Sequence, residues 1–368
     1  MFTVVGVLGA SGETGRIVTQ LLAEHSDAAL VLFGRRTSAL EDVRTRLPDP
    51  SRAEVRAVDA TDPEALKAAL RGVDLVVATA PLLDRLDTVL PTVLEAGCDW
   101  VDVFLDGPAK WMVLRRLEPA IDAAGRCVIT GCGMHPGLAA VLIRAVAHKF
   151  DTLRRADVAQ LIAADWNSYT FSPETMAEFT QELTGFDMSA LVGGRWRKQM
   201  WRSARVDFGP PYGRRFCAPM GLEEIRRLPG QFPALSDAAL LMAGLNPVTD
   251  WLVMPVSMVM TLVSRRLAGP AARLLLWSLR RFSRPPYGCV AQVVAEGAGH
   301  APVRLSVRHG EGGYWLTAAV AVATTLQYLD GTIRAPGVHI EGLVTDPARL
   351  LADLEDWGAT IDQATRVA

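Results

Sequence analysis

Apolar runs alternate with amphipathic segments throughout the first 150 residues. The apolar, β-branched runs predict strands over 3–9, 29–34, 54–58, 74–79, 100–103 and 127–130. Apolar positions at helical spacing predict helices over 13–24, 62–72, 86–96, 113–124 and 136–150. Asp62 is a suitable N-cap for the second of these helices, and Gly72 suits its end. Strands separated by single helices predict a Rossmann-type, doubly wound parallel sheet.

The pattern changes after about residue 150. Runs 156–164, 289–296 and 303–308 alternate as strands do, 194–208 resembles a hairpin arm rich in Arg and Trp, and 314–329 and 347–357 predict helices. These segments favour a second α/β domain built on a mostly antiparallel sheet. We therefore expect a nucleotide-binding domain over 1–133, a substrate-binding and dimerisation domain over 134–335, and a C-terminal segment, 336–368, that packs back on the body.

A glycine-rich loop joins the first predicted strand to the first predicted helix. Its sequence is Gly9-Ala-Ser-Gly12-Glu-Thr-Gly15. In this context the glycines permit a tight turn, close approach of the backbone to a pyrophosphate, and close helix–sheet packing. The free N–H groups and partial positive charge of the helix N-terminus attract phosphate. The predicted contacts of a dinucleotide here are Gly9, Ser11, Gly12, Glu13, Thr14 and Gly15. The alternative is a turn without a ligand.

The end of the second predicted strand bears on the choice of dinucleotide. NAD-preferring sites place Asp or Glu there to bind the ribose 2′-hydroxyl, whereas this chain has Phe33-Gly34-Arg35-Arg36. A guanidinium suits a 2′-phosphate because it donates two parallel hydrogen bonds. Arg35 therefore favours NADP(H), unless both arginines are only solvated surface residues.

Two later strand ends add candidates for cofactor contacts. Asp59 follows the third predicted strand and is placed to reach the adenine, although it is equally interpretable as a polar residue flanking a helix. Ala80 and Pro81 follow the fourth strand and are expected near the middle of the cofactor, because ligands bind beyond the carboxyl ends of parallel strands.

The composition excludes several classes of protein. The formal net charge of −2 gives no field that would attract nucleic acid. The five cysteines are scattered and form no CxxC pair, which argues for reduced thiols in a cytoplasm and against a structural zinc site. The apolar N-terminus has no basic leader and is interpreted as a strand, and no apolar run is long enough to span a bilayer. We expect a soluble, cytoplasmic protein without a metal.

Several segments together resemble the saccharopine dehydrogenase-like family of NAD(P)-binding oxidoreductases. They are 9–15 with Arg35, 59–66, 96–102, 131–138, 314–331, and 337–338 with 346–347. The resemblance implies a nucleotide-binding domain, a domain with a mostly antiparallel sheet, and an active site in the cleft between them. It also implies hydride transfer, in the best-known members at a C–N bond and in others at lipid-linked enoyl groups. His135 is a departure, because amino-acid-condensing members often have an acidic residue in this turn.

Hydride comes from the cofactor, so the protein must orient the acceptor and move a proton. His135 is the first candidate for this acid–base role, since its pKa can lie near 7. The alternative is a histidine that caps the next helix or bonds a backbone carbonyl. Tyr169 is a second candidate, with a structural aromatic as the alternative. Asp102 and Lys110 are weaker candidates, and Cys132 is interpreted as a small core residue.

The stretch 251–282 is unusual for a soluble domain. It is apolar and carries arginines, with no acidic residue from Trp251 to Ala295. One interpretation is a basic amphipathic helical pair that contacts an anionic membrane or an apolar substrate. The favoured alternative is a pair of core or dimer-interface helices with extended arginines.

The leading hypothesis is an NADPH-dependent oxidoreductase, acting as a homodimer on a small-molecule substrate with an imine or carbonyl-type acceptor. The alternatives are an enoyl reductase for lipid-like substrates and a non-catalytic NADP-binding sensor, which needs the phosphate loop but no proton donor.

Overall fold

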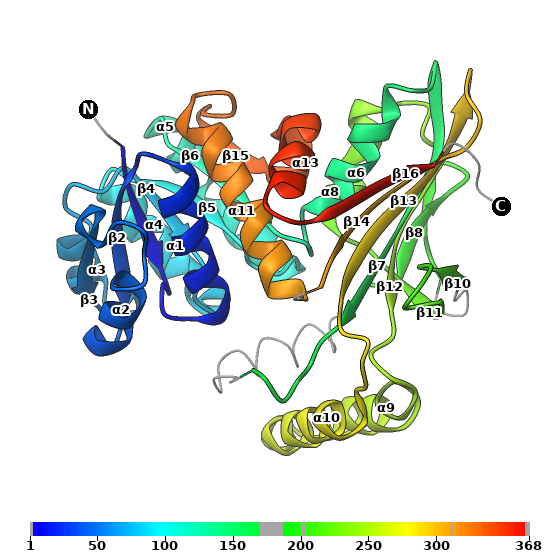
Figure 1. Ribbon diagram of the computed structural model, residues 1–368, viewed down its shortest axis with the longest axis horizontal. Helices are drawn as coiled ribbons and strands as arrows, with labels where there is room; N and C mark the ends of the chain where they lie inside the picture. Colours follow the sequence, from blue (N-terminus) through cyan, green and yellow to red (C-terminus); the bar gives the residue numbers. More distant parts are fainter. Residues whose placement is uncertain (1–2, 170–186, 200–203, 311, 365–368) are drawn as a thin grey trace. The chain divides into compact units, whose positions relative to one another are not determined.

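The computed structural model describes residues 3–169, 187–199, 204–310 and 312–364 (Figure 1). The chain divides into two compact units. The first comprises Met1–Leu138 and Tyr314–Trp357, and the second comprises Ala139–Gly313 and Gly358–Ala368. Each unit therefore takes a piece of the C-terminal region, which the sequence placed in a single segment.

A parallel seven-stranded sheet forms the centre of the first unit. Its strand order is β15-β6-β5-β4-β1-β2-β3, and every pairing is parallel. The strands are β1 (Val4–Leu8), β2 (Ala29–Gly34), β3 (Ala53–Ala57), β4 (Leu75–Ala78), β5 (Asp99–Asp102), β6 (Cys127–Thr130) and β15 (Gly337–Ile340). The predicted Rossmann-type sheet is confirmed, and β15 adds a strand that the sequence pattern did not predict.

Helices follow the strands of the first unit, and the pattern predicted all of them except α2 and α12. They are α1 (Glu13–His25), α2 (Thr37–Arg44), α3 (Pro63–Ala69), α4 (Leu86–Glu95), α5 (Pro108–Ala123), α11 (Gly313–Leu329), α12 (Glu341–Val344) and α13 (Pro347–Asp356). The Asp62 carboxylate caps α3 by accepting a hydrogen bond from Ala65 N at 3.1 Å. Helix α5 begins five residues earlier than expected, because Pro108 occupies its first turn and Lys110 and Trp111 are buried.

Nearly all of α11 clusters with the first unit, although the sequence suggested that residues up to 335 belong to the second domain. The helix is buried along most of its length. Near its end, the Tyr328 hydroxyl donates a hydrogen bond to Asp99 Oδ2 at 2.5 Å. Strand β15 then pairs with β6, so the chain after α11 continues the parallel sheet.

A mixed, mostly antiparallel sheet forms the centre of the second unit. Its main path is β10-β11-β12-β7-β13-β14-β16, with β8 and β9 attached at β12. The strands are β7 (Thr152–Ala163), β8 (Ser189–Val192), β9 (Arg195–Lys198), β10 (Ala204–Asp207), β11 (Arg214–Met220), β12 (Asp237–Ala243), β13 (Gly288–Ala298), β14 (Val303–His309) and β16 (Thr360–Ala364). Among the described strands of this sheet, only β12 and β7 pair in parallel. The predicted second α/β domain with a mostly antiparallel sheet is confirmed.

The helices of the second unit are α6 (Leu138–Ala147), α8 (Glu223–Gln231), α9 (Met254–Val263) and α10 (Ala268–Phe282). Figure 1 shows α9 and α10 beyond one end of β7, β12 and β13, not across a face of the sheet.

The stretch 194–208, expected as one hairpin arm, contains two strands that belong to different pairs. Strand β9 pairs with the preceding β8, and β10 pairs with the following β11. Residues 200–203 of the stretch lie outside the described part of the chain. Alternation along the sequence indicates extended backbone but does not identify the partner strand.

All five cysteines lie in the described part of the chain, buried and without a disulfide. In that part of the chain, no helix has the length and apolar character needed to cross a bilayer.

The Tyr328–Asp99 hydrogen bond generates the first prediction. Burial, and then the bond to Asp99, raises the pKa of Tyr328. Tyr328→Phe should lower the free energy of unfolding by about 1–3 kcal/mol, because Asp99 loses a buried donor. Urea denaturation followed by circular dichroism measures this change.

Arg334→Gln is the matched control. Its guanidinium lies 3.8 Å from Asp99 Oδ2, but the side chain is half exposed. Loss of such an exposed pair should cost less than about 1 kcal/mol. An equal decrease in the free energy of unfolding in Tyr328→Phe and Arg334→Gln would contradict a dominant role for the Tyr328 hydroxyl.

Candidate functional site

The phosphate loop is closed by contacts that require glycine. Gly9 has φ of +93°, and a Cβ there would lie 2.7 Å from Ala80 N. A Cβ on Gly15 would lie 2.1 Å from the Gly9 carbonyl oxygen. Helix α1 therefore approaches the end of β1 as closely as backbone atoms allow, which is the packing expected of a dinucleotide loop.

Helix α1 begins at the end of this loop. Gly12 is the N-cap, and no side chain caps the helix there. The first N–H groups of a helix have no partner within the helix, so their dipoles favour an anion. Thr14 is buried and Ser11 is half-buried. The Glu13 carboxylate forms an ion pair with Arg16 at 2.5 Å, so its side chain is engaged within the first turn.

The ends of β2 and β4 adjoin the same loop. Gly9 N and Ala10 N both donate to the Phe33 carbonyl, at 2.9 and 3.2 Å, and Ala80 N donates to the Leu8 carbonyl at 3.0 Å. Arg35 follows β2 directly and is exposed, and so is Pro81. The structure thus brings Gly9–Gly15, Arg35 and Ala80 to one edge of the parallel sheet.

Asp59 follows β3 and is exposed. Its carboxylate accepts hydrogen bonds from Thr61 N at 3.0 Å and from Thr61 Oγ1 at 2.8 Å. These bonds are the main reason that its pKa is lowered, and the charge of Arg35 contributes in the same direction. The hydrogen bonds match the interpretation of Asp59 as a turn residue before α3, and its proximity to Arg35 keeps it beside the candidate site.

His135 lies in the turn between β6 and α6. It is half-buried, in the segment from Gly131 to Gly137. Gly137 has φ of +124°, and a Cβ there would lie 2.5 Å from Glu341 Oε2. Met134 N donates to Thr317 Oγ1 at 3.3 Å. Glu341 and Thr317 shape this turn, yet they are about 200 residues away in sequence, and no local pattern marks them.

Tyr169 belongs to the second unit, whereas His135 belongs to the first. Its carbonyl accepts a hydrogen bond from Arg280 Nη2 at 3.3 Å, and its side chain is half-buried. A Cβ on Gly312 would lie 3.2 Å from the Tyr169 hydroxyl. The two predicted catalytic residues are therefore held by separate sets of contacts.

The Asp102 carboxylate is fully buried at the end of β5. It accepts hydrogen bonds from Trp100 Nε1, Phe104 N, Lys110 Nζ, Thr130 Oγ1 and Gly131 N, at 2.9–3.3 Å. Lys110 is equally buried and also donates to the Phe104 carbonyl at 2.9 Å. These partners satisfy both charges inside the protein, so we assign Asp102 and Lys110 a structural role.

Cys132 is completely buried, and burial raises the pKa of its thiol well above the usual value. A thiol held in its neutral form is a poor nucleophile, which agrees with its interpretation as a core residue. Among the described residues, no group of His, Cys, Asp or Glu side chains is arranged to bind a metal.

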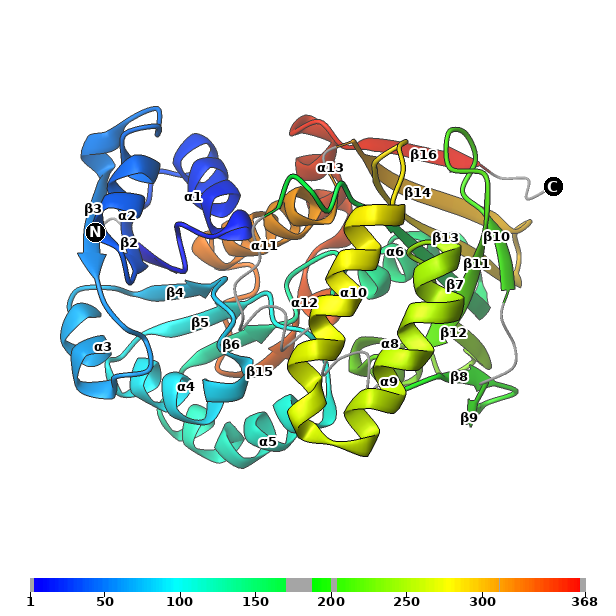
Figure 2. The same ribbon diagram turned by 90° about the horizontal axis from the view of Figure 1, so that it is seen from below.

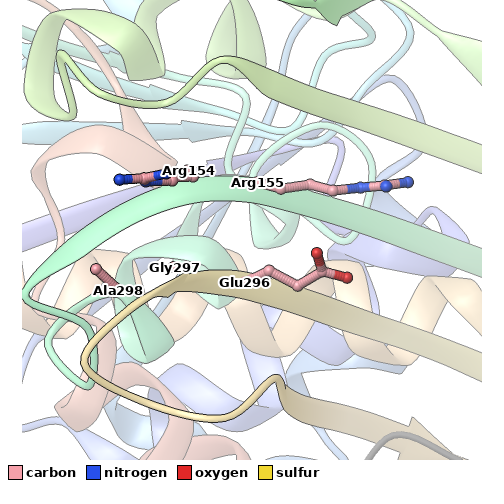
Figure 3. Close-up of a pocket in the computed structure, with 5 residues that line it drawn as sticks. All are labelled: Arg154, Arg155, Glu296, Gly297 and Ala298. Carbon is pink, nitrogen blue, oxygen red and sulfur yellow. The ribbon is translucent and has the colours of Figure 1, made fainter.

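Two shallow cavities are lined by none of the predicted site residues. One, of about 330 Å³, is lined by Arg154, Arg155, Glu296, Gly297 and Ala298 in the second unit. Figure 3 shows the two arginine side chains leaving β7 in opposite directions. Arg155 forms an ion pair with Asp157 at 2.6 Å, so its charge is partly compensated within the strand. The other cavity, of about 340 Å³, lies against α3.

Comparisons with known proteins agree with this geometry. Residues 9–98 match the family described as NAD(P)H-binding, so the first unit contains an NAD(P)-binding domain. The structure superposes on saccharopine dehydrogenase (L-Glu forming) from Saccharomyces cerevisiae with a TM-score of 0.69. That match covers 99% of this chain and 100% of the other at 16% identity. The chain therefore has the saccharopine dehydrogenase fold.

Curated relatives match over shorter stretches. A probable mitochondrial saccharopine dehydrogenase-like oxidoreductase from Arabidopsis thaliana is 27% identical over 143 residues, or 34% of this chain and 31% of the relative. An N-acetyl-gamma-glutamyl-phosphate reductase from Nostoc ellipsosporum is 29% identical over 102 residues, or 28% of each chain. The matches thus span less than a third of these relatives' own lengths. The resemblance to the saccharopine dehydrogenase-like family is confirmed, in fold over the full chain and in sequence over part of it.

The contact between Gly15 and Gly9 generates the second prediction. Gly15→Ala should weaken NADPH binding by at least about tenfold, because a methyl group 2.1 Å from the Gly9 carbonyl must displace the loop from the phosphates. Titration of the fluorescence of NADPH measures this loss. Gly107→Ala is the control, since its Cβ would meet nothing within 4 Å. Unchanged affinity in Gly15→Ala would exclude this loop as the phosphate site.

Proposed function

We propose that this protein is an NADPH-dependent oxidoreductase of the saccharopine dehydrogenase-like type. Its cofactor would bind along the edge of the first unit formed by the phosphate loop and the ends of β2 and β4. The observation that carries the proposal is the close packing of Gly15 against Gly9, with an uncapped helix N-terminus beside it. The full-length fold match and the partial sequence relative support the same class of activity.

Arg35 supports NADP(H) over NAD(H). It is exposed immediately after β2, at the position from which an acidic residue would bind the ribose hydroxyls of NAD. The following residues start α2 at Thr37, and Arg36 at its N-cap provides no side-chain cap. A 2′-phosphate at this position would therefore meet a guanidinium and a second helix N-terminus.

The third prediction tests this choice of cofactor. Arg35→Asp should raise the dissociation constant for NADPH by about 10–100-fold, because it removes a charge-assisted bond and adds repulsion. The constant for NADH should change much less. Both are measured by fluorescence titration. Arg71→Asp is the matched control, because this exposed arginine of the same unit lies after α3. Equal losses for the two cofactors in Arg35→Asp would refute the assignment.

We propose His135 as the group that exchanges a proton with the acceptor during hydride transfer. It sits at the carboxyl edge of the same sheet as the phosphate loop, because parallel strands end on one side. Contacts of Gly137 with Glu341 and of Met134 with Thr317 fix the conformation of its turn. Tyr169 remains the second candidate for this role, from the other unit. An imine or carbonyl acceptor would need such a donor when hydride arrives at carbon.

The fourth prediction concerns turnover. Imines, mixtures of keto acids with amines, and enoyl compounds are first screened for NADPH oxidation. With the best substrate, His135→Ala should lower kcat by about 10²–10⁴-fold, because a general acid is removed. NADPH affinity should stay within about threefold. His148→Ala, which changes an exposed histidine of the second unit, should leave both unchanged.

Unchanged kcat in His135→Ala would remove this residue from the mechanism and leave Tyr169→Phe as the next variant. If none of the three substrate classes supports NADPH oxidation while NADPH still binds, the result would instead favour a non-catalytic NADP sensor. Activity on enoyl compounds alone would favour the enoyl reductase.

A further inference from the structure

The helical pair formed by α9 and α10, with the turn Thr249–Val253 that precedes α9, exposes an unusual number of large apolar side chains. Ten large hydrophobic residues of the described chain are exposed, and eight of them lie between 251 and 277. These eight, which we call the apolar patch, are Trp251, Leu252, Val256, Met258, Val259, Leu262, Val263 and Trp277. The most exposed are Leu262 at 80% and Val263 at 74%, at the end of α9. Exposed patches of this kind mark interaction surfaces.

The polarity of the pair is partly inverted relative to a water-soluble helical hairpin. Small and polar side chains lie between the helices. Ser257 Oγ donates to the Ala271 carbonyl at 3.5 Å, and the buried hydroxyls of Thr249 and Ser278 lie 2.9 Å apart. A soluble hairpin would place its large apolar residues inside and its polar residues outside. Here much of the outward face of α9 is built from Val, Met and Leu.

The pair is nevertheless firmly attached to the second unit. Val253, Leu275 and Leu279 form a small core with Trp166, Leu245, Val248 and Leu274. Arg280 Nε also donates to the Trp166 carbonyl at 3.2 Å. Figure 2 shows the two helices side by side and antiparallel, joined by the short connection after Val263. The apolar patch is therefore presented by a fixed element of the fold.

The stretch of chain that carries the apolar patch contains only positive charges, although Asp250 directly precedes it. From Trp251 to Ala295 the chain has six arginines and no acidic residue. Arg266, Arg273, Arg280, Arg281 and Arg284 are exposed. A protein with a net charge of −2 has therefore concentrated positive charge beside this exposed apolar patch. An apolar surface flanked by arginines is complementary to a lipid surface with anionic headgroups.

We propose that α9 and α10 form a peripheral docking surface for anionic membranes. Leu262, Val263 and their apolar neighbours would enter the boundary between headgroups and acyl chains, and the arginines would contact lipid phosphates. The exposed aromatic residues Trp251 and Trp277 suit the same interface, because an indole has both an apolar body and a polar N–H group. The pair lies on the membrane and does not cross it. None of the residues of this surface belongs to the proposed cofactor site.

The experiment is vesicle flotation of the full chain. With vesicles of phosphatidylcholine and phosphatidylglycerol at 150 mM salt, most of the protein should float. With phosphatidylcholine alone, partitioning should fall by at least about tenfold, because each arginine near an anionic surface strengthens binding by about fivefold. Protein that stays at the bottom with anionic vesicles, or floats equally well with both, would overturn the proposal.

Matched variants separate the two contributions. Leu262→Asp with Val263→Asp should reduce flotation by at least about tenfold, since both sites are highly exposed and the change leaves the small core of the pair intact. Arg273→Gln with Arg281→Gln should reduce it on anionic vesicles only. The control is Met112→Asp with Arg116→Gln, which changes a Met that is 69% exposed and an exposed Arg, both on α5 in the first unit. A loss in the control equal to that in the other variants would overturn the assignment to α9 and α10.

Circular dichroism and NADPH titration check that each variant is folded, and unchanged values are expected. Sedimentation without lipid tests the other occupant of the patch, a second copy of this chain. The proposal would be overturned in favour of a dimer interface by two results together. The wild-type protein would be a dimer that the double variant Leu262→Asp, Val263→Asp converts to a monomer, and the wild-type protein would not float with vesicles.

Discussion

The buried Asp102 carboxylate is the constraint on which the candidate site depends. It accepts hydrogen bonds from the end of β5, from the start of α5 through Lys110, and from Thr130 and Gly131 at the end of β6. Burial of a charge is costly unless it is paired and hydrogen-bonded, so these elements must keep one arrangement. The turn that carries His135 begins at Gly131, directly on this network.

The phosphate loop is held by a different kind of constraint. There the determining contacts are steric, between Gly15 and Gly9 and between Gly9 and Ala80. Both constraints act at the carboxyl edge of one parallel sheet, where ligands of doubly wound folds bind. The proposed cofactor site and the proposed proton donor therefore share a scaffold, although one is set by the absence of side chains and the other by a buried charge.

The stretch 251–282 shows where a sequence pattern stays ambiguous. Leu, Val, Met and Trp among arginines are compatible with core helices, with a dimer interface and with a membrane-facing pair. The favoured expectation was a pair of core helices or of dimer-interface helices. Within a single chain most of the apolar residues of α9 are not core residues, because the buried positions are taken by residues such as Ser257 and Ala271. A dimer interface over this stretch stays a prediction. Periodicity identifies a helix and its faces, but it does not say which face the rest of the chain covers.

By itself the sequence determined the alternation of strands and helices, the phosphate loop and the arginine after β2. Each of these is a local pattern, so neighbouring residues suffice to define it. Only the tertiary structure decided that β15 joins β6, that α11 clusters with the first unit, and that Glu341 and Thr317 support the His135 turn. It also decided which residues of α9 and α10 are exposed. These features depend on contacts between residues far apart in the chain, and local propensity carries no information about such partners.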